Sequence, residues 1–170
     1  MYDSCEGVAL DDAEAVRWYR RAAEQGHAGA QNNLGLMYDY GEGIAIDDVE
    51  AARWYRAAAE QDHSGGQNNL GLMYDYGEGV EQNAAEAVRW YRLAAEQDHA
   101  GAQNNLALKY LAGDGVDQDL LLSYMWSNIS LAMGREEAQE NLDTVAEQLS
   151  ADQIADAENQ VLEWLAQRGW

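Results

Sequence analysis

The chain has 170 residues, of which 47% are hydrophobic, and this size and apolar content suffice for a packed core. Its 31 acidic residues outnumber its 10 basic residues, giving a net charge of −21, which disfavours binding to nucleic acid and to anionic lipid. No run of 18 apolar residues indicates a membrane span, and no basic segment followed by an apolar one indicates an N-terminal signal peptide.

Residues 1–8 align with residues 37–44, so we expect the chain to begin inside a repeated unit. Two alternatives explain this start: either the natural protein begins with a broken unit, or the chain is a fragment of a longer protein. Cys5 is the single cysteine, and it stands where later units have glycine. A lone thiol forms no intramolecular disulfide, and no neighbouring base is specified to activate it, so we interpret Cys5 as an incidental surface thiol.

Residues 12–43 predict two helices separated by a turn. From residue 12, apolar side chains recur at intervals of three and four residues, which is typical of one face of a helix. Gly26 then suits the left-handed position after a helix end, where a side chain would be strained. A second helix is predicted over residues 28–40, and the turn Gly41-Glu-Gly43 ends it. The following Asp47 is expected to cap the next helix.

The unit recurs with a period of 36 residues, as its tryptophans show at Trp18, Trp54, Trp90 and Trp126. A fixed period of this length is typical of a solenoid. We predict one solenoid domain over residues 1–170, divided into a partial repeat at 1–8, repeats at 9–44, 45–80 and 81–116, a degenerate repeat at 117–149 and a C-terminal capping helix at 150–170.

The repeat decays after residue 116. Ser127 and Leu131 replace the tyrosine and the alanine of earlier units, and helices are predicted over about 120–133 and 136–149. Ser150, followed by Gln153, resembles a capping box and predicts a last helix that ends near residue 167. We expect this helix to cover the open end of the stack, which repeat proteins need for solubility. Docking of another chain on it is the alternative.

Three stretches of the unit resemble a known family. They are Ala30-Gln-Asn-Asn-Leu34-Gly35-Leu-Met-Tyr38, then Gly41-Glu-Gly43-Ile44, then Ala52-Arg-Trp54-Tyr55. Over roughly residues 1–142 the chain resembles the Sel1-like repeat (SLR) family, which is related to tetratricopeptide repeats. The resemblance implies an all-α fold, a right-handed α-α superhelix of tandem antiparallel helix pairs. It also implies that the helix at 28–40 and its copies line the concave surface.

The histidines and the glycine turns do not indicate a metal, cofactor or phosphate site. His27, His63 and His99 fall in different repeats, which lie about 8 to 10 Å or more apart, whereas one zinc ion holds its ligands at about 2 Å. We interpret each histidine as part of the turn into its own helix. No strand precedes the Gly-x-Gly turns, as a phosphate loop would require. We therefore expect no cofactor and no metal.

One face of the 28–40 helix and its copies gives the candidate site. In tetratricopeptide domains, which these repeats resemble, the asparagine before Leu-Gly can bind the backbone of an extended peptide, and Asn33, Asn69 and Asn105 match it. A carboxamide both donates and accepts hydrogen bonds, which suits a peptide group. Bridging to the next repeat, or simple duplication, is the alternative. The predicted partner-binding residues are Asn32, Asn33, Leu36, Asp39, Tyr40, Asn68, Asn69, Leu72, Asp75, Tyr76, Asn104, Asn105 and Leu108.

We interpret the chain as a non-enzymatic scaffold or adaptor that binds a peptide or extended loop of basic character on its concave face. In this hypothesis asparagines hold the backbone, Tyr40 and Tyr76 give apolar contact, and Asp39 and Asp75 select positive charge. The acidity is equally typical of a solvated helix surface or of adaptation to salt. The oligomeric state and the compartment, bacterial cytoplasm or periplasm, stay open.

Two other functions remain as alternatives. An acidic mimic of nucleic acid would occupy a cationic site of another protein and would lose affinity as salt is raised. A hydrolase is the second, because the SLR family includes a cysteine-rich secreted branch described as binding or hydrolysing β-lactams. The chain lacks the paired cysteines of that branch, so the resemblance does not carry this activity over.

Overall fold

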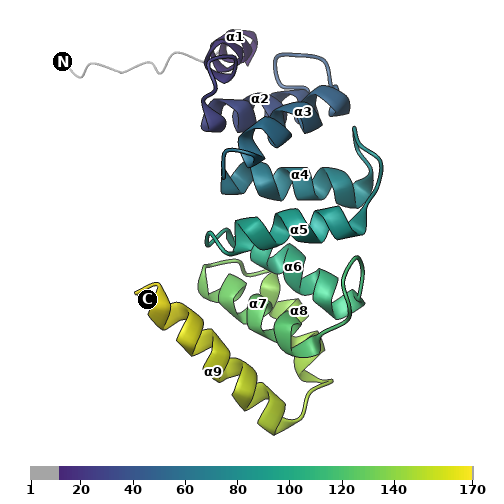
Figure 1. Ribbon diagram of the computed structural model, residues 1–170, viewed down its shortest axis with the longest axis vertical. Coiled ribbons are helices and arrows are strands. Elements are labelled where there is room, and N and C mark those ends of the chain that lie inside the picture. Colours follow the sequence, from purple (N-terminus) through teal and green to yellow (C-terminus); the bar gives the residue numbers. More distant parts are fainter. Residues whose placement is uncertain (1–11, 170) are drawn as a thin grey trace, which may run out of the picture.

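The computed structural model describes residues 12–169, and every regular element in this range is a helix. The helices follow one another as an elongated stack, with α1 at one end and α9 at the other (Figure 1). The helices of the described range are α1 (Asp12–Ala23), α2 (Ala28–Tyr40), α3 (Asp48–Ala59), α4 (Ser64–Tyr76), α5 (Ala84–Ala95), α6 (Ala100–Ala112), α7 (Leu120–Ala132), α8 (Ala138–Ala146) and α9 (Ala151–Gln167).

From α1 to α8 each helix packs mainly on its neighbours in the chain, which confirms the predicted all-α stack of helix pairs. We call α2, α4, α6 and α8 the first helices of the pairs, and α3, α5 and α7 the second helices. No described helix has the length and apolar character that crossing a membrane requires. The segment 1–8 and Cys5, on which we based two expectations, lie outside the described residues.

The second helices begin at side-chain caps. Asp47 Oδ1 accepts a hydrogen bond from the backbone N–H of Glu50 at 3.1 Å, which confirms the predicted cap of α3. Asn83 caps α5 and Asp119 caps α7 in the same way. A cap of this kind satisfies a backbone donor that has no partner inside the helix.

The Gly-x-Gly turns end the first helices, as predicted, and they also bring two parts of the backbone into close contact. The first glycine of each turn is left-handed, as at Gly77 with φ 74°. The second, Gly79, has φ 65° and lies against the start of α3, where an added Cβ would overlap the backbone of Asp48. Gly43 and Gly115 lie equally close to the starts of α1 and α5. These glycines therefore fix the distance between successive second helices.

A buried tyrosine fills the space between α2 and α3, and another fills the space between α4 and α5. Tyr55 is fully buried, and its ring lies against Gly35, where an added Cβ would be 2.6 Å from the ring. Tyr91 packs against Gly71 in the same way one repeat later. The missing side chain at glycine thus makes room for the aromatic ring, and the helices approach closely around it.

Buried glutamines link neighbouring repeats. Gln31 Oε1 accepts a hydrogen bond from Gln61 Nε2 at 2.6 Å, and Gln67 Oε1 accepts one from Gln97 Nε2 at 2.7 Å. The third member, Gln103, still donates to the backbone carbonyl of Ala95, but its buried Oε1 has no hydrogen-bond partner. The reason is in the sequence, because Met133 stands where the two earlier repeats have Gln61 and Gln97.

We expect Met133→Gln to raise the free energy of unfolding by about 1 kcal/mol, because it supplies the donor that Gln103 Oε1 lacks. Urea unfolding followed by circular dichroism measures the change. The matched control is Gln97→Met, which removes the donor from Gln67 and should destabilise the chain by a similar amount. An unchanged or lower stability for Met133→Gln would contradict this account.

The C-terminal helix α9 lies beside α7, on which it packs (Figure 1). Trp164 meets Trp126 edge to face with ring centroids 5.9 Å apart, and Val161 is buried in the same cluster. Arg168 Nε donates to Asp98 Oδ1 at 2.9 Å, which ties the end of α9 to the turn before α6. The capping box of Ser150 and Gln153 is present, as predicted.

Helix α8 is shorter than the predicted 136–149. It begins at Ala138 and ends at Ala146, because the N–H groups of Gln148 and Leu149 bond three residues back, to Val145 and Ala146, and so close a tight turn. Leu149 still packs, partly buried, against Val145 and Ala157.

Candidate functional site

The first helices form the inner side of the stack. Helix α2 contacts α4, and α6 contacts α8, whereas α4 and α6 approach less closely. Within the described range, no two of the second helices α3, α5 and α7 have a contact comparable to the first two. Helices that approach more closely lie on the inside of a curved stack. The face that carries the predicted binding residues therefore belongs to the more closely packed row.

Asparagines on this face form a chain of hydrogen bonds across three repeats. Asn105 Nδ2 donates to Asn68 Oδ1 at 3.1 Å, and Asn69 Nδ2 donates to Asn32 Oδ1 at 3.1 Å. Within repeats, Asn68 Nδ2 donates to Asn69 Oδ1 and Asn32 Nδ2 to Asn33 Oδ1. All four bonds run in one direction, from Asn105 to Asn33. We call these five residues and their bonds the asparagine ladder.

The ladder is the bridge between repeats that we weighed as the alternative to peptide binding. Asn32 and Asn68 are buried, whereas Asn33, Asn69 and Asn105 are partly exposed. A carboxamide has two donor hydrogens and an oxygen with two lone pairs, so a ladder bond uses only part of its capacity. The partly exposed asparagines thus keep hydrogen-bonding capacity toward solvent, and their predicted contact with a partner stays a prediction.

A further asparagine that we did not predict lies at the C-terminal side of this face. Asn141 Nδ2, on α8, donates to Asn104 Oδ1 at 2.9 Å. The signal was present in the sequence, because Ala138-Gln-Glu-Asn141-Leu142 repeats Ala102-Gln-Asn-Asn-Leu106 with the same period. Helix α8 is therefore the first helix of a further repeat.

The two predicted aspartates hold the buried tyrosines. Tyr55 Oη donates to Asp39 Oδ2 at 2.9 Å, and Tyr91 Oη donates to Asp75 Oδ2 at 3.2 Å. Burial, followed by the nearby carboxylate, raises the pKa of both tyrosines far above the ordinary value, so each stays a hydrogen-bond donor. Each carboxylate is thereby fixed in position beside the first-helix face.

Asp75 has a second partner that Asp39 lacks. Lys109, the only lysine of the chain, places Nζ against Asp75 Oδ1 and at 2.7 Å from Asp114 Oδ2. Burial by itself lowers the pKa of Lys109, but the hydrogen bonds to Asp114 and Asp75 outweigh it, and the pKa is raised. The ammonium group of Lys109 is therefore charged, and it offsets the negative charge of the Asp75 carboxylate.

Two pockets open on this face, one repeat apart. The pocket between α2 and α4 has a volume of about 380 Å³, and the pocket between α4 and α6 has one of about 390 Å³. Tyr40 and Tyr76 stand beside them with 67% of each residue exposed, Leu108 is exposed, and Leu36 and Leu72 are half-buried. The structure therefore brings eleven of the thirteen predicted residues into the pockets or the ladder, and leaves Leu36 on this face beside them. Asn104, the remaining buried asparagine, bonds Asn141 as described.

All three histidines stand at helix starts, as predicted, but only His63 and His99 cap their helices with the side chain, whereas His27 makes no such bond. His63 Nδ1 accepts a hydrogen bond from the backbone N–H of Gly66 at 3.1 Å, and His99 Nδ1 accepts one from Ala102 at 3.1 Å. Burial lowers the pKa of His99, which keeps the imidazole neutral and Nδ1 free to accept. Within residues 12–169, no three histidine, cysteine or acidic side chains gather as a metal site would require.

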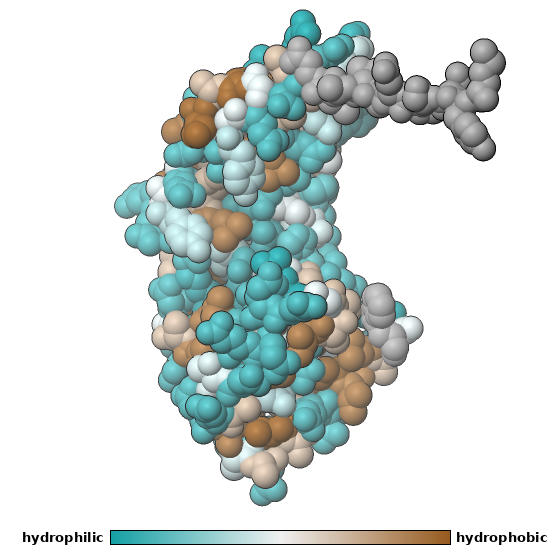
Figure 2. Space-filling view, turned by 180° about the vertical axis from the view of Figure 1, so that it is seen from behind, coloured by the Kyte–Doolittle hydropathy of each residue, from teal (hydrophilic) through white to brown (hydrophobic). Residues whose placement is uncertain are grey.

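The surface drawn in Figure 2 is mostly hydrophilic, with apolar side chains in scattered groups. This agrees with the net charge of −21. A partner with positive charge would be attracted to such a surface, and an acidic one repelled.

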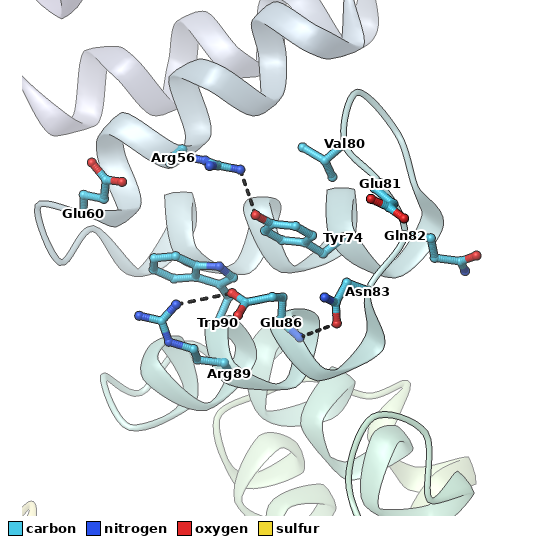
Figure 3. A pocket seen from close by; sticks show the side chains of 10 residues that line it. All are labelled: Arg56, Glu60, Tyr74, Val80, Glu81, Gln82, Asn83, Glu86, Arg89 and Trp90. Carbon is cyan, nitrogen blue, oxygen red and sulfur yellow. Dashed lines mark hydrogen bonds and ion pairs between the residues drawn. The ribbon is translucent and has the colours of Figure 1, made fainter.

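A pocket of about 840 Å³ lies between α3 and α5 and is lined by side chains of both helices, of the turn before α5 and by Tyr74 of α4 (Figure 3). Both arginines that line it already have partners. Arg56 Nη2 donates to Tyr74 Oη at 2.8 Å, and Arg89 pairs with Glu86 at 3.3 Å. Arg20 and Arg92 bond Tyr38 and Tyr110 in the same way. The pairing makes this pocket a weaker candidate than the two pockets of the first-helix face.

The model of the Sel1 repeat matches the chain at residues 4–27, 28–63, 64–99 and 100–134, and these matches together cover most of it. The chain belongs to the Sel1 repeat family. The family's repeat begins at a first helix, since the last three matches start where α2, α4 and α6 start. Sel1 repeat proteins generally mediate protein–protein interactions and are typically scaffolds without enzymatic activity.

Solved Sel1 repeat structures agree with this assignment. The chain is 37% identical, with a TM-score of 0.79, to a protective antigen of uropathogenic Escherichia coli strains that displays an SLR fold. It is 32% identical, with a TM-score of 0.68, to a Sel1 repeat protein from Oxalobacter formigenes. The matches cover 93% and 76% of this chain, but only 35% and 56% of those two proteins.

A third structure shares the fold alone. Helicobacter pylori cysteine rich protein B is 20% identical, with a TM-score of 0.61, and the match covers 81% of this chain and 98% of that protein. No curated protein matches the sequence.

Proposed function

We propose that this Sel1 repeat chain is a non-enzymatic scaffold that binds an extended peptide or loop of a partner protein along α2, α4 and α6. The observation that carries the proposal is the pair of equivalent pockets in successive repeats, each beside an exposed tyrosine. An extended chain is a repeating structure, and a row of matching pockets offers it matching contacts.

The chemistry of the face supports a peptide as the ligand. Tyr40 and Tyr76 provide rigid apolar surface with a polar tip, which is typical of residues at protein interfaces. Asn69 and Asn105 belong to the ladder and also line the pockets, so a peptide group in a pocket can reach their carboxamides. The acidic surface favours a partner segment with positive charge.

The test places a photo-crosslinking amino acid at Tyr76, which is exposed on the first-helix face, and irradiates the chain in extracts of cells that express it. We expect covalent adducts with one or a few proteins, identified by mass spectrometry. The control places the same group at Val49, which is 65% exposed on the second helix α3. Adducts at Val49 with none at Tyr76 would overturn the proposed binding face.

Tyrosine variants then test the energetics. Tyr40→Ala with Tyr76→Ala should weaken the captured partner's affinity at least tenfold while the thermal midpoint stays unchanged, because both side chains are mostly exposed. Alanine at Asn33, Asn69 and Asn105 is a less clean test, since the last two donate hydrogen bonds between repeats.

A further inference from the structure

We propose that the pocket between α2 and α4 binds the ammonium group of a lysine side chain from the partner. The place that the ammonium would take corresponds to the one that Lys109 Nζ occupies in the next repeat. The identity of the partner rests on the proposed function, but the pocket can be tested with a peptide alone.

The two pockets are copies of each other. Seven residues line the first pocket, and each has a counterpart 36 positions later that lines the second. The pairs, first pocket before second, are Asp39 and Asp75, Tyr40 and Tyr76, Asn69 and Asn105, Leu72 and Leu108, Met73 and Lys109, Tyr76 and Ala112, and Glu78 and Asp114.

The second pocket already contains its cation. Lys109 Nζ lies between Asp75 and Asp114 and bonds both carboxylates, although Lys109 as a whole is only 8% exposed. The chain therefore demonstrates, in its own fold, how this arrangement of two carboxylates holds an ammonium group.

The first pocket has the two carboxylates without the lysine. Met73 forms its floor with a side chain of similar length but no charge, and no basic side chain of residues 12–169 pairs with Asp39 or Glu78. Asp39 is held by Tyr55 Oη at 2.9 Å, as Asp75 is by Tyr91, so the first carboxylate has a fixed position before any ligand arrives. A pre-positioned carboxylate lowers the cost of binding a cation.

The walls of the first pocket suit the rest of a lysine side chain. Tyr40 and Tyr76 both line it, whereas in the second pocket alanine replaces the second tyrosine. Two exposed aromatic rings offer apolar surface for the methylene groups and a face for the cation. In the second pocket Lys109 already occupies the place between the two carboxylates, so this pocket has no room there for a second ammonium group.

The experiment titrates ¹⁵N-labelled protein with a short alanine-rich peptide that contains one lysine, and with the same peptide carrying N-ε-acetyl-lysine. We expect the lysine peptide to shift the side-chain amide signals of Asn69 more than those of Asn105, and the acetylated peptide to shift neither strongly. Equal shifts at both asparagines, or equal binding of both peptides, would overturn the proposal.

Two variants exchange the pockets. Met73→Lys places an internal ammonium in the first pocket and should weaken binding of the lysine peptide at least tenfold. The charge-matched control is Leu162→Lys on α9, which is 64% exposed and lies outside both pockets, and it should weaken binding less than twofold.

Adding Lys109→Met to Met73→Lys should move the signal changes to Asn105. Equal loss of binding in Met73→Lys and Leu162→Lys would show general charge attraction alone and refute the site.

The outcomes separate this inference from the proposed function. Partner adducts at position 76 without selective binding of the lysine peptide would refute the lysine site and leave the scaffold standing. Selective binding of the peptide without partner adducts at position 76 would support the lysine site and refute the proposed scaffold function.

Discussion

Gly79→Ala is expected to lower the free energy of unfolding by about 4 kcal/mol, because the substitution adds two separate costs. Gly79 has φ 65°, a conformation that side chains rarely adopt, and its Cβ would overlap the backbone of Asp48 at the start of α3. A backbone cannot rotate aside as a flexible side chain can, so the two helix pairs must move apart. For a chain of this size we expect the thermal midpoint to fall by about 10 °C, measured by circular dichroism.

Gly26→Ala separates the two costs. Gly26 has φ 89°, but an added Cβ there would meet no atom within 4 Å. This variant therefore reports the conformational cost alone, and we expect a loss of about 1 kcal/mol. Losses of equal size at Gly26 and Gly79 would show that the close contact with α3 contributes nothing.

The sequence predicted the repeat and most helix ends, because these depend on local chemistry. The predicted helix 28–40 has the bounds of α2, and the caps at Asp47 and Ser150 are present. Caps and glycine turns act within a few residues, so their signals can be seen in one stretch of sequence. The close approach of Gly79 to Asp48 joins residues far apart in the chain, and no local signal marks it.

Coupled substitutions were visible in the sequence, but their meaning was not. In the second complete repeat Gly71 makes room for Tyr91, whose hydroxyl bonds Asp75. The corresponding positions of the next repeat hold Ala107, Ser127 and Leu111. Once the tyrosine is lost, the glycine is no longer needed to accommodate a ring, and the aspartate loses the donor that it held. The three substitutions are therefore linked through one set of contacts, which the structure shows and the sequence does not.

The sequence predicted which residues of the candidate site line up in columns, but the hydrogen bonds among them could be identified only from the structure. The period alone aligns Asn33, Asn69 and Asn105, but it does not say whether a carboxamide turns to solvent or to the next repeat. The partners of Lys109 are equally invisible, because Asp75 lies a whole repeat away. Side-chain direction on a shared face depends on the distance between helices, and that distance is set by packing.

Asn68→Ala is expected to lower the free energy of unfolding by about 2 kcal/mol, because Asn68 is an internal member of the asparagine ladder. Its Oδ1 accepts from Asn105 in the next repeat, its Nδ2 donates to Asn69, and the residue is buried. Removing this buried carboxamide takes away the donor to Asn69 Oδ1 and the acceptor of Asn105 Nδ2, and the loss of two hydrogen bonds costs more than the loss of one. Urea unfolding gives the size of the change.

The matched control is Asn33→Ala, because Asn33 stands at the end of the ladder. It is partly exposed, and its ladder contact is a single acceptor bond from Asn32 at 3.4 Å. We expect a loss below about 0.5 kcal/mol, since water can replace this one bond. Similar losses at positions 33 and 68 would mean that the ladder does not couple the repeats. A large loss at 68 alone would mean that the ladder couples the repeats. Asn69 and Asn105 belong to the ladder and also line the pockets, so a peptide bound there would contact the groups that join the repeats.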